Sequence, residues 1–254
     1  MSTLLVASIG NTRVALGVFD LAPAGGIPCL VIAESPPLPL PPGPPPPLET
    51  DRRVDAAVLA SVNPSSDPDV AEWIARAFGV EIVRFPQDVP PTVAVRCREP
   101  ETVGPDRLAN AVAACAEFTP PCVIVDAGTA ITVDAVSGDR AFLGGAILPG
   151  LRLCGRALAE GTALLPEPDL AIEPPVIGAT TAEAMASGVL RGLAGAVDRL
   201  VHDMTRELGG TARVLATGGD AARLAERCGT RPTLRPHLAL TGLAVAFAAA
   251  HGPA

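Results

Sequence analysis

The chain has 254 residues, of which 48% are hydrophobic, so it can bury one large core or two smaller cores of about 120 residues each. Its formal net charge of −8 argues against nucleic acid or an anionic membrane as the main partner. The chain contains no lysine, and its basic residues other than histidine are all arginine. This composition excludes a P-loop lysine and a Schiff-base lysine.

The six cysteines form no CxxC pair, which favours reduced thiols in a cytoplasmic protein over a zinc site or a disulfide framework. No positively charged segment precedes the first apolar run, so we expect no signal peptide. The longest apolar stretch, 238–250, is interrupted by Thr241 and Gly242 and is too short to span a bilayer. We expect it to form a buried terminal helix rather than a membrane anchor.

The first half of the chain opens with apolar runs at 4–8 and 14–19 that predict a β-hairpin. A proline-dominated stretch at 35–48 follows. Such a run favours the polyproline II conformation. It resembles an SH3-type ligand, but we favour an exposed connection between strands. The remaining elements expected in this half are a strand at 54–62, a helix at 67–78, a strand at 81–85 and a helix at 107–117.

The second half begins with a similar hairpin over 122–136. A short strand is expected at 140–143, followed by a helix near 151–160. The periodicity over 181–207 predicts one long helix or two joined helices. A strand at 213–216 and helices at 221–227 and 238–249 complete the pattern.

The hairpin followed by helices and strands occurs twice, which predicts a duplicated α/β fold with a mixed sheet in each half. We expect the halves to be residues 1–118, which include the Pro-rich loop 35–48, and residues 119–254. The cleft between two such halves is the default place for a ligand.

The two hairpins carry related polar turns. The first is Gly10-Asn11-Thr12 and the second is Asp126-Ala127-Gly128-Thr129. Backbone N–H groups and a hydroxyl at such a turn can bind phosphate, and Asp126 would add a cation ligand. Each turn also fits an ordinary hairpin connection, and only the pairing of the two favours phosphate.

A third motif, Gly104-Pro105-Asp106-Arg107, precedes a predicted helix. The helix dipole would keep Asp106 ionised, so that it could accept a hydroxyl proton during phosphoryl transfer. Arg107 could bind a carboxylate or phosphate through two hydrogen bonds. A capped helix start with a surface ion pair explains the same residues equally well.

Glycine pairs provide two further candidates. Thr217-Gly218-Gly219 follows a predicted strand, where the backbone could pass close to adenine or ribose. Gly144-Gly145, with Pro149-Gly150 just after it, has the same two interpretations, a ligand contact or an ordinary turn.

Taken together and in order, these segments resemble the type III pantothenate kinases of the actin, sugar-kinase and Hsp70 superfamily. The resemblance covers nearly the whole chain, and its residue blocks are 10–12, 61–64, 104–107, 126–129, 144–151, 164–166, 177–181 with 187–188, 217–219 and 237–243. It implies a duplicated ribonuclease-H-like (actin-like ATPase) fold. It also implies ATP-dependent phosphorylation of pantothenate, the first step of coenzyme A synthesis, by a cytoplasmic homodimer that uses Mg²⁺ and a monovalent cation (K⁺ or NH₄⁺).

The resemblance also assigns roles to individual residues. Asp106 matches the proton acceptor of the family, Asp126 the potassium ligand, and Thr129 an ATP contact. The remaining matches are a pantothenate-contacting set, Gly104, Pro105, Asp106, Arg107 and Thr181, and a first phosphate-binding loop, Ser8, Ile9, Gly10, Asn11, Thr12, Arg13, Val14 and Ala15.

Three positions depart from the family pattern. The family carries an aspartate that helps to place magnesium where this chain has Ser8, and a small polar residue where it has Arg13. The asparagine that precedes the substrate-contacting threonine is Thr180 here. A serine hydroxyl is a weaker ligand for a hard dication than a carboxylate. These departures motivate an alternative, in which the chain is a catalytically impaired homologue that binds ligand or regulates transcription.

Overall fold

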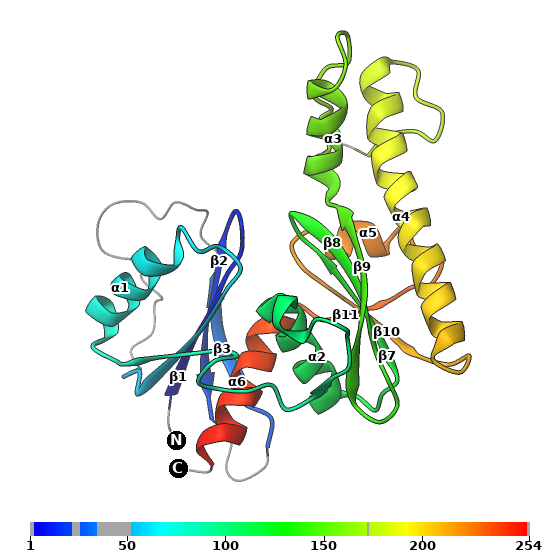
Figure 1. Ribbon diagram of the computed structural model, residues 1–254. Coiled ribbons are helices and arrows are strands. Elements are labelled where there is room, and N and C mark those ends of the chain that lie inside the picture. The colour runs from blue at the N-terminus through cyan, green and yellow to red at the C-terminus, as the bar shows by residue number, and fades with distance from the viewer. Residues whose placement is uncertain (1–2, 22–25, 35–51, 172, 253–254) are drawn as a thin grey trace. The chain divides into compact units, whose positions relative to one another are not determined.

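The structure is a computed structural model that describes residues 3–21, 26–34, 52–171 and 173–252 (Figure 1). The Pro-rich stretch 35–48 lies outside the described residues, so its predicted role as a connection stays a prediction. Within the described residues, no helix is both long and apolar enough to cross a membrane.

The first sheet has five strands and is mixed, as the sequence predicts. Its order is β3 (Cys29–Glu34), β2 (Val14–Asp20), β1 (Thr3–Ile9), β4 (Ala56–Ser61) and β5 (Ile82–Arg84). The pairs β1–β2 and β2–β3 are antiparallel, whereas β1–β4 and β4–β5 are parallel. Strand β3 was not expected, because it is an edge strand whose exposed positions leave no clear alternation in the sequence.

The second sheet repeats this order. It runs β11 (Thr233–Leu234), β10 (Arg213–Thr217), β7 (Cys122–Ala127), β8 (Ala130–Val136), β9 (Ala141–Pro149) and β6 (Ala94–Val95). Without β6, the order 9-8-7-10-11 matches 3-2-1-4-5 of the first sheet. The pair β7–β8 is antiparallel and β7–β10 is parallel, as in the matching pairs β1–β2 and β1–β4. The duplicated α/β fold is therefore confirmed.

Strand β9 is longer than the short strand expected at 140–143, since it runs from Ala141 to Pro149. Gly144 and Gly145 consequently lie inside a strand and not in a loop. A Cβ atom at Gly145 would lie 2.1 Å from the backbone oxygen of Val133 in β8. The glycine allows close approach of two neighbouring strands. The pair is therefore not the ordinary turn that was one of its two interpretations.

Contacts divide the chain into two compact units, Met1–Thr119 with Arg140–Phe142 and His237–Ala254, and Pro120–Asp139 with Leu143–Pro236. We call them unit 1 and unit 2 and describe each by itself. This division follows contacts and not the repeated pattern, so the boundary near residue 118 between duplicated halves stays a prediction.

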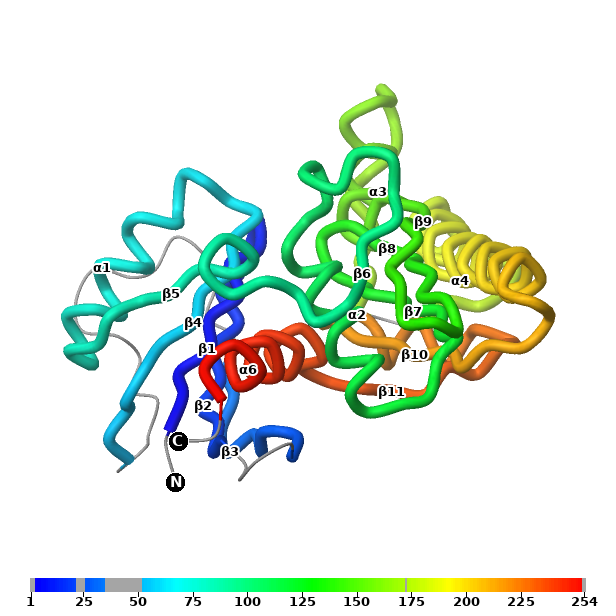
Figure 2. Tube along the Cα trace, turned by 60° about the horizontal axis from the view of Figure 1, so that its bottom comes forward, coloured from blue at the N-terminus to red at the C-terminus, as the bar shows by residue number. Residues whose placement is uncertain are grey.

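The helices of unit 1 cover both faces of its sheet. Helix α1 (Asp67–Phe78) packs Val70 and Ile74 against Leu5, Ala7 and Ile9 on one face. Helices α2 (Pro105–Glu117) and α6 (Leu238–His251) pack against each other, and α6 lies beside β1 and β2 in Figure 2. A short 3₁₀ helix, Pro100–Thr102, precedes α2. The terminal helix is buried as expected.

Unit 2 contains α3 (Leu151–Glu160), α4 (Thr181–Glu207) and α5 (Ala221–Ala225). The predicted 27-residue segment 181–207 forms one continuous helix, and its apolar face packs on β7 and β8. Helix α5 ends two residues before the predicted Arg227. Helices α3 and α4 lie side by side in Figure 1.

Candidate active site

The β1–β2 connection of unit 1 is a tight turn at the carboxyl end of β1. The backbone N–H of Gly10 donates to the carbonyl of Arg13 over 2.9 Å, which closes the turn. Asn11, Thr12 and Arg13 are exposed, whereas the flanking Ile9 and Val14 are buried. The candidate phosphate-binding loop therefore presents polar groups on a rigid apolar base.

The chain segment that follows β4 lies beside this turn. The backbone N–H of Val62 donates to the carbonyl of Ile9 over 2.9 Å, which extends the parallel β1–β4 pairing by one bond. Next to it, Nδ2 of Asn63 donates to the carbonyl of Gly10 over 3.4 Å. The carboxyl ends of β1 and β4 thus meet at one edge, where ligands of α/β sheets commonly bind.

The first turn of α2 lies at the same edge. Gly104 is the N-cap and Pro105 the first helical residue. A Cβ atom at Gly104 would lie 2.6 Å from Oδ1 of Asp106 and 3.7 Å from a methyl carbon of Val62. Three segments far apart in the sequence, 10–13, 61–63 and 104–107, therefore come together in unit 1.

Asp106 lies half-buried in this arrangement, and burial raises its pKa above the ordinary value of 3.8. The backbone N–H of Arg107, which donates to Oδ1 over 2.8 Å, and the positive charge of Arg107 act in the opposite direction but are outweighed. The sequence analysis considered only the helix dipole, which favours the ionised form. The burial that raises the pKa was not visible in the sequence, and the expectation that Asp106 is ionised stays a prediction.

Arg107 lies over an aromatic ring. Its guanidinium carbon is 5.4 Å from the centroid of Phe142, at the start of β9, and Phe142 is fully buried. The carbonyl of Phe142 accepts from the backbone N–H of Arg96, next to the pairing of β6 with β9. This hydrogen bond holds the backbone of Phe142 in place. A cation–π contact of this kind restricts the positions that the guanidinium can take.

Unit 2 has a matching turn between β7 and β8. The N–H of Gly128 donates to the carbonyl of Ala130 over 2.9 Å, and Thr129 is exposed at the tip. The carbonyl of Thr129 accepts from the N–H of Gly150, which precedes α3, over 3.0 Å. The Pro149-Gly150 motif is thus brought to the second turn.

The glycine pair after β10 also reaches this turn. A Cβ atom at Gly218 would lie 2.4 Å from the carbonyl oxygen of Ala127 and 2.6 Å from Oδ1 of Asp126. Gly218 has φ +95°, a conformation that favours glycine. The N–H of Asp220 donates to the carbonyl of Ala127 over 2.9 Å. The pair is a strand-to-helix turn, and it lies directly against Asp126.

A cavity of about 390 Å³ adjoins these residues in unit 2. Its lining includes Asp220 and Arg223 from the β10–α5 region and Leu151 and Arg152 from the start of α3. Its size lies within the range of small-molecule sites.

Thr181 lies elsewhere in unit 2, at the first position of α4. It lines a largely apolar groove of about 700 Å³ between α3 and α4, which also includes Pro149, Cys154 and Met185. The preceding residue, Thr180, caps the helix: its hydroxyl accepts from the N–H of Glu183, and the Glu183 carboxylate accepts from the N–H of Thr180, each over 3.2 Å. The motif 177–181 therefore forms the start of α4, and the contact of Thr181 with substrate stays a prediction.

Two residues of the site were not predicted individually. Asn63 belongs to the block 61–64 of the family resemblance. An asparagine between a strand and a helix is common in capping patterns, and this was its only signal. Phe142 gave no local signal, since its contact with Arg107 joins residues that are far apart in the sequence.

Comparison of the sequence with known proteins identifies a family. The family model "Type III pantothenate kinase" matches residues 46–203. The chain belongs to the type III pantothenate kinase family. A type III pantothenate kinase of Akkermansia muciniphila is 39% identical over 194 residues, which cover 76% of this chain and 78% of that protein. One from Finegoldia magna is 30% identical over 244 residues, with 88% of each chain covered.

Solved structures agree on the fold of this family member. A putative Baf family transcriptional activator from Campylobacter jejuni has a TM-score of 0.62 at 18% identity, with 96% of both chains covered. An activator of 2-hydroxyisocaproyl-CoA dehydratase from Clostridium difficile, solved with bound ADPNP, has a TM-score of 0.53 at 12% identity, covering 98% of this chain and 95% of that one. At such identities the likeness shows the fold alone, so it does not favour a regulatory role.

Proposed function

We propose that this chain transfers the γ-phosphoryl group of ATP to the primary hydroxyl of pantothenate, the first step of coenzyme A synthesis. The observation that carries the proposal is the meeting of the turn 10–13, the segment 61–63 and the α2 start 104–107 around Asp106 in a member of this family. These three segments supply an anion-binding turn, a carboxylate and a guanidinium at one sheet edge.

Asp106 would act as the proton acceptor. As the hydroxyl oxygen of pantothenate bonds to the γ-phosphorus and ADP departs, the hydroxyl proton passes to the Asp106 carboxylate. Burial raises the pKa of Asp106, and a more basic carboxylate accepts a proton more readily as long as it remains ionised.

Arg107 would bind the carboxylate of pantothenate. Its planar guanidinium can donate two parallel hydrogen bonds to a carboxylate, and the ring of Phe142 lies against it. Gly104 and Pro105 shape the backbone around this site, and Thr181 would be a further contact to pantothenate, as the family resemblance implies.

Each unit would contribute contacts to ATP, as the family resemblance implies. The loop from Ser8 to Ala15 would contact phosphates through its backbone N–H groups and the Thr12 hydroxyl, and Thr129 would contribute a second hydroxyl. The cavity beside Asp220 and Arg223 adjoins the second turn, so it is a suitable place for the nucleoside.

Cations would neutralise the phosphate charge. Among the described residues, no group of three or more His, Cys, Asp or Glu side chains could enclose a metal ion. Mg²⁺ at nucleotide sites generally keeps several waters and takes only one or two carboxylates besides the phosphates, so the lack of such a group does not argue against it. Asp126 would be the ligand of the monovalent cation, with the backbone of Gly218 packed against its carboxylate.

The protein would form a homodimer in the cytoplasm. Large apolar side chains near the α3–α4 groove are exposed: Leu164, Val176 and Ile177 have exposed fractions of 92%, 70% and 88%. Such a surface favours a second copy of the chain over water. All six cysteines are free thiols, as expected for a reducing compartment.

The direct test is an assay with pantothenate, ATP, Mg²⁺ and K⁺, in which 4′-phosphopantothenate is identified by mass. We expect product with the unaltered chain and a large loss with Asp106→Asn. If no product forms at high enzyme concentration while calorimetry still detects nucleotide binding, the kinase proposal is wrong and a binding or regulatory role replaces it.

A further inference from the structure

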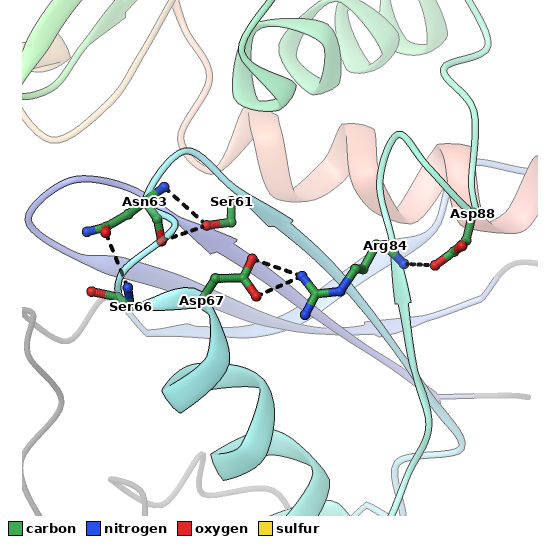
Figure 3. A network of polar contacts seen from close by, with 6 residues as sticks. All are labelled: Ser61, Asn63, Ser66, Asp67, Arg84 and Asp88. Carbon is green, nitrogen blue, oxygen red and sulfur yellow. Dashed lines mark hydrogen bonds and ion pairs between the residues drawn. The ribbon is translucent and has the colours of Figure 1, made fainter. Parts of the chain in front are cut away.

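We propose that Asn63 is a positioning residue that holds the phosphate-binding turn 10–13 in its binding conformation. This inference rests on the proposed function and concerns a residue to which the family match assigns no role here. It starts from the polar contacts that Figure 3 shows near the ends of β4 and β5, together with the contact of Asn63 to Gly10 at the end of β1, which the figure does not draw.

The side-chain amide of Asn63 reaches in two directions. Its Oδ1 accepts from the hydroxyl of Ser65 over 2.7 Å and from the N–H of Ser66 over 3.3 Å. These two donors fix the orientation of the amide, because the reverse orientation would place Nδ2 against them. Nδ2 therefore points toward the carbonyl of Gly10, 3.4 Å away.

The backbone of Asn63 is anchored independently of that contact. Its N–H donates to the Ser61 hydroxyl over 3.1 Å, and its carbonyl accepts from the N–H groups of Ser66 and Asp67 over 3.2 and 3.1 Å. Asp67 in turn forms a 2.7 Å ion pair with Arg84 of β5 (Figure 3). Asn63 thus joins the exposed turn to the rigid start of α1.

The Gly10 carbonyl matters because of the peptide bond to which it belongs. In a trans peptide the C=O and the following N–H point in opposite directions. When Asn63 holds the carbonyl of Gly10, it also directs the N–H of Asn11 away from Asn63. That N–H is one of the donors that the proposed function requires for phosphate, so a freely rotating peptide would lose part of the nucleotide affinity.

The test compares two substitutions with a matched control. Asn63→Ser leaves a hydroxyl that can accept from Ser66 but cannot reach Gly10, and it adds no charge. Asn63→Asp keeps the acceptor for Ser65 and Ser66 and replaces the donor that faces Gly10. Ser65→Ala is the control, since it removes a contact to Oδ1 and leaves the Asn63–Gly10 contact in place.

We expect both Asn63 variants to raise the KM for ATP about three- to tenfold, the range for losing one hydrogen bond, with kcat and the KM for pantothenate changed less than about twofold. Hydrogen exchange over 9–14 should become faster in these variants but not in Ser65→Ala. Calorimetric titration with ATP should show the same loss of affinity without turnover, so a failure of the kinase proposal would be seen separately.

An unchanged ATP affinity in folded Asn63→Ser and Asn63→Asp would overturn the proposal. Equal rises in both KM values together with a lower Tm would also overturn it, because they would indicate a purely structural role. Should Asn63→Ser fail to fold, Asn63→Asp decides the outcome, measured at two salt concentrations to separate repulsion of phosphate from loss of the hydrogen bond.

Discussion

The backbone N–H of Arg107 donates a 2.8 Å hydrogen bond to Oδ1 of Asp106, so this carboxylate lies against the start of its own helix. A side chain at position 104 would collide with the same oxygen, since its Cβ would lie 2.6 Å away. Each residue of the sequence Gly-Pro-Asp-Arg therefore has its own role. Glycine leaves room for the carboxylate, and proline starts the helix. Aspartate and arginine carry the proposed chemistry.

The first prediction concerns Asp106 as proton acceptor. Asp106→Asn should lower kcat by about 10²- to 10⁴-fold, the usual contribution of a general base. The unaltered protein should lose kcat/KM on the acid side with an apparent pKa above that of an ordinary aspartate, because burial raises the pKa of Asp106. A pH–rate profile measures both.

The same substitution should stabilise the fold. Because the pKa of Asp106 is higher in the folded than in the unfolded state, the folded state binds more protons between the two values, and stability falls as pH rises through that window. Asp106→Asn removes this penalty, so its Tm should exceed that of the unaltered protein at neutral pH and not below the ordinary aspartate pKa. A lower Tm at neutral pH would contradict the raised pKa.

Ser8 carries the second prediction. It lies half-buried at the carboxyl end of β1, opposite Ala15. Asp20, a carboxylate on the same hairpin, cannot replace the missing aspartate, because it pairs with Thr3 at the far end of the hairpin, about 20 Å along the strands. Ser8→Asp should raise kcat about tenfold or more and lower the Mg²⁺ concentration for half-maximal rate.

Ser8→Asn is the matched control for that experiment, since it has nearly the same size as aspartate but no charge. It should leave the Mg²⁺ dependence unchanged. If Ser8→Asp gives an equal or lower rate than the unaltered chain, Ser8 does not occupy the position of a lost metal ligand.

The sequence predicted those parts of the fold that local patterns encode. The helix 67–78, the hairpin 122–136 and the helix 181–207 are confirmed because each has a strong period of its own. Strand β3 and the full length of β9 were missed, since an exposed edge strand and paired glycines weaken that period. The motif residues were identified from the chain, but the burial of Asp106 and its partners depends on long-range packing.

Gly218 supports the third prediction. Gly218→Ala should destabilise the protein by about 1–3 kcal/mol and weaken ATP binding, because its Cβ would overlap the Ala127 carbonyl and the Asp126 carboxylate. Gly219→Ala is the control, since a Cβ there meets no atom within 4 Å. Denaturant unfolding and ATP titration distinguish them; equal effects at both positions would show that the close approach to Asp126 is unimportant.

The fourth prediction explains the threonine at position 180. Its hydroxyl caps α4, and asparagine is an equally good N-cap residue. Thr180→Asn should therefore leave stability unchanged within about 0.5 kcal/mol, whereas Thr180→Ala should cost about 1 kcal/mol, measured by denaturant unfolding. A large loss with asparagine would mean that the hydroxyl has a role besides capping.

The last prediction concerns the ring beneath Arg107. Phe142→Leu keeps most of the apolar volume but removes the aromatic face 5.4 Å from the guanidinium. A cation–π contact is worth about 0.5–2 kcal/mol, so the KM for pantothenate should rise about two- to thirtyfold. The KM for ATP should stay nearly constant, because the ring acts on the substrate through Arg107. Arg107→Gln tests the same link, since glutamine carries no cation over the ring, and Phe142→Leu should have little further effect on the KM for pantothenate in that background. Additive losses in the double variant would show that the two residues act independently, and Phe142 would then be an ordinary core residue.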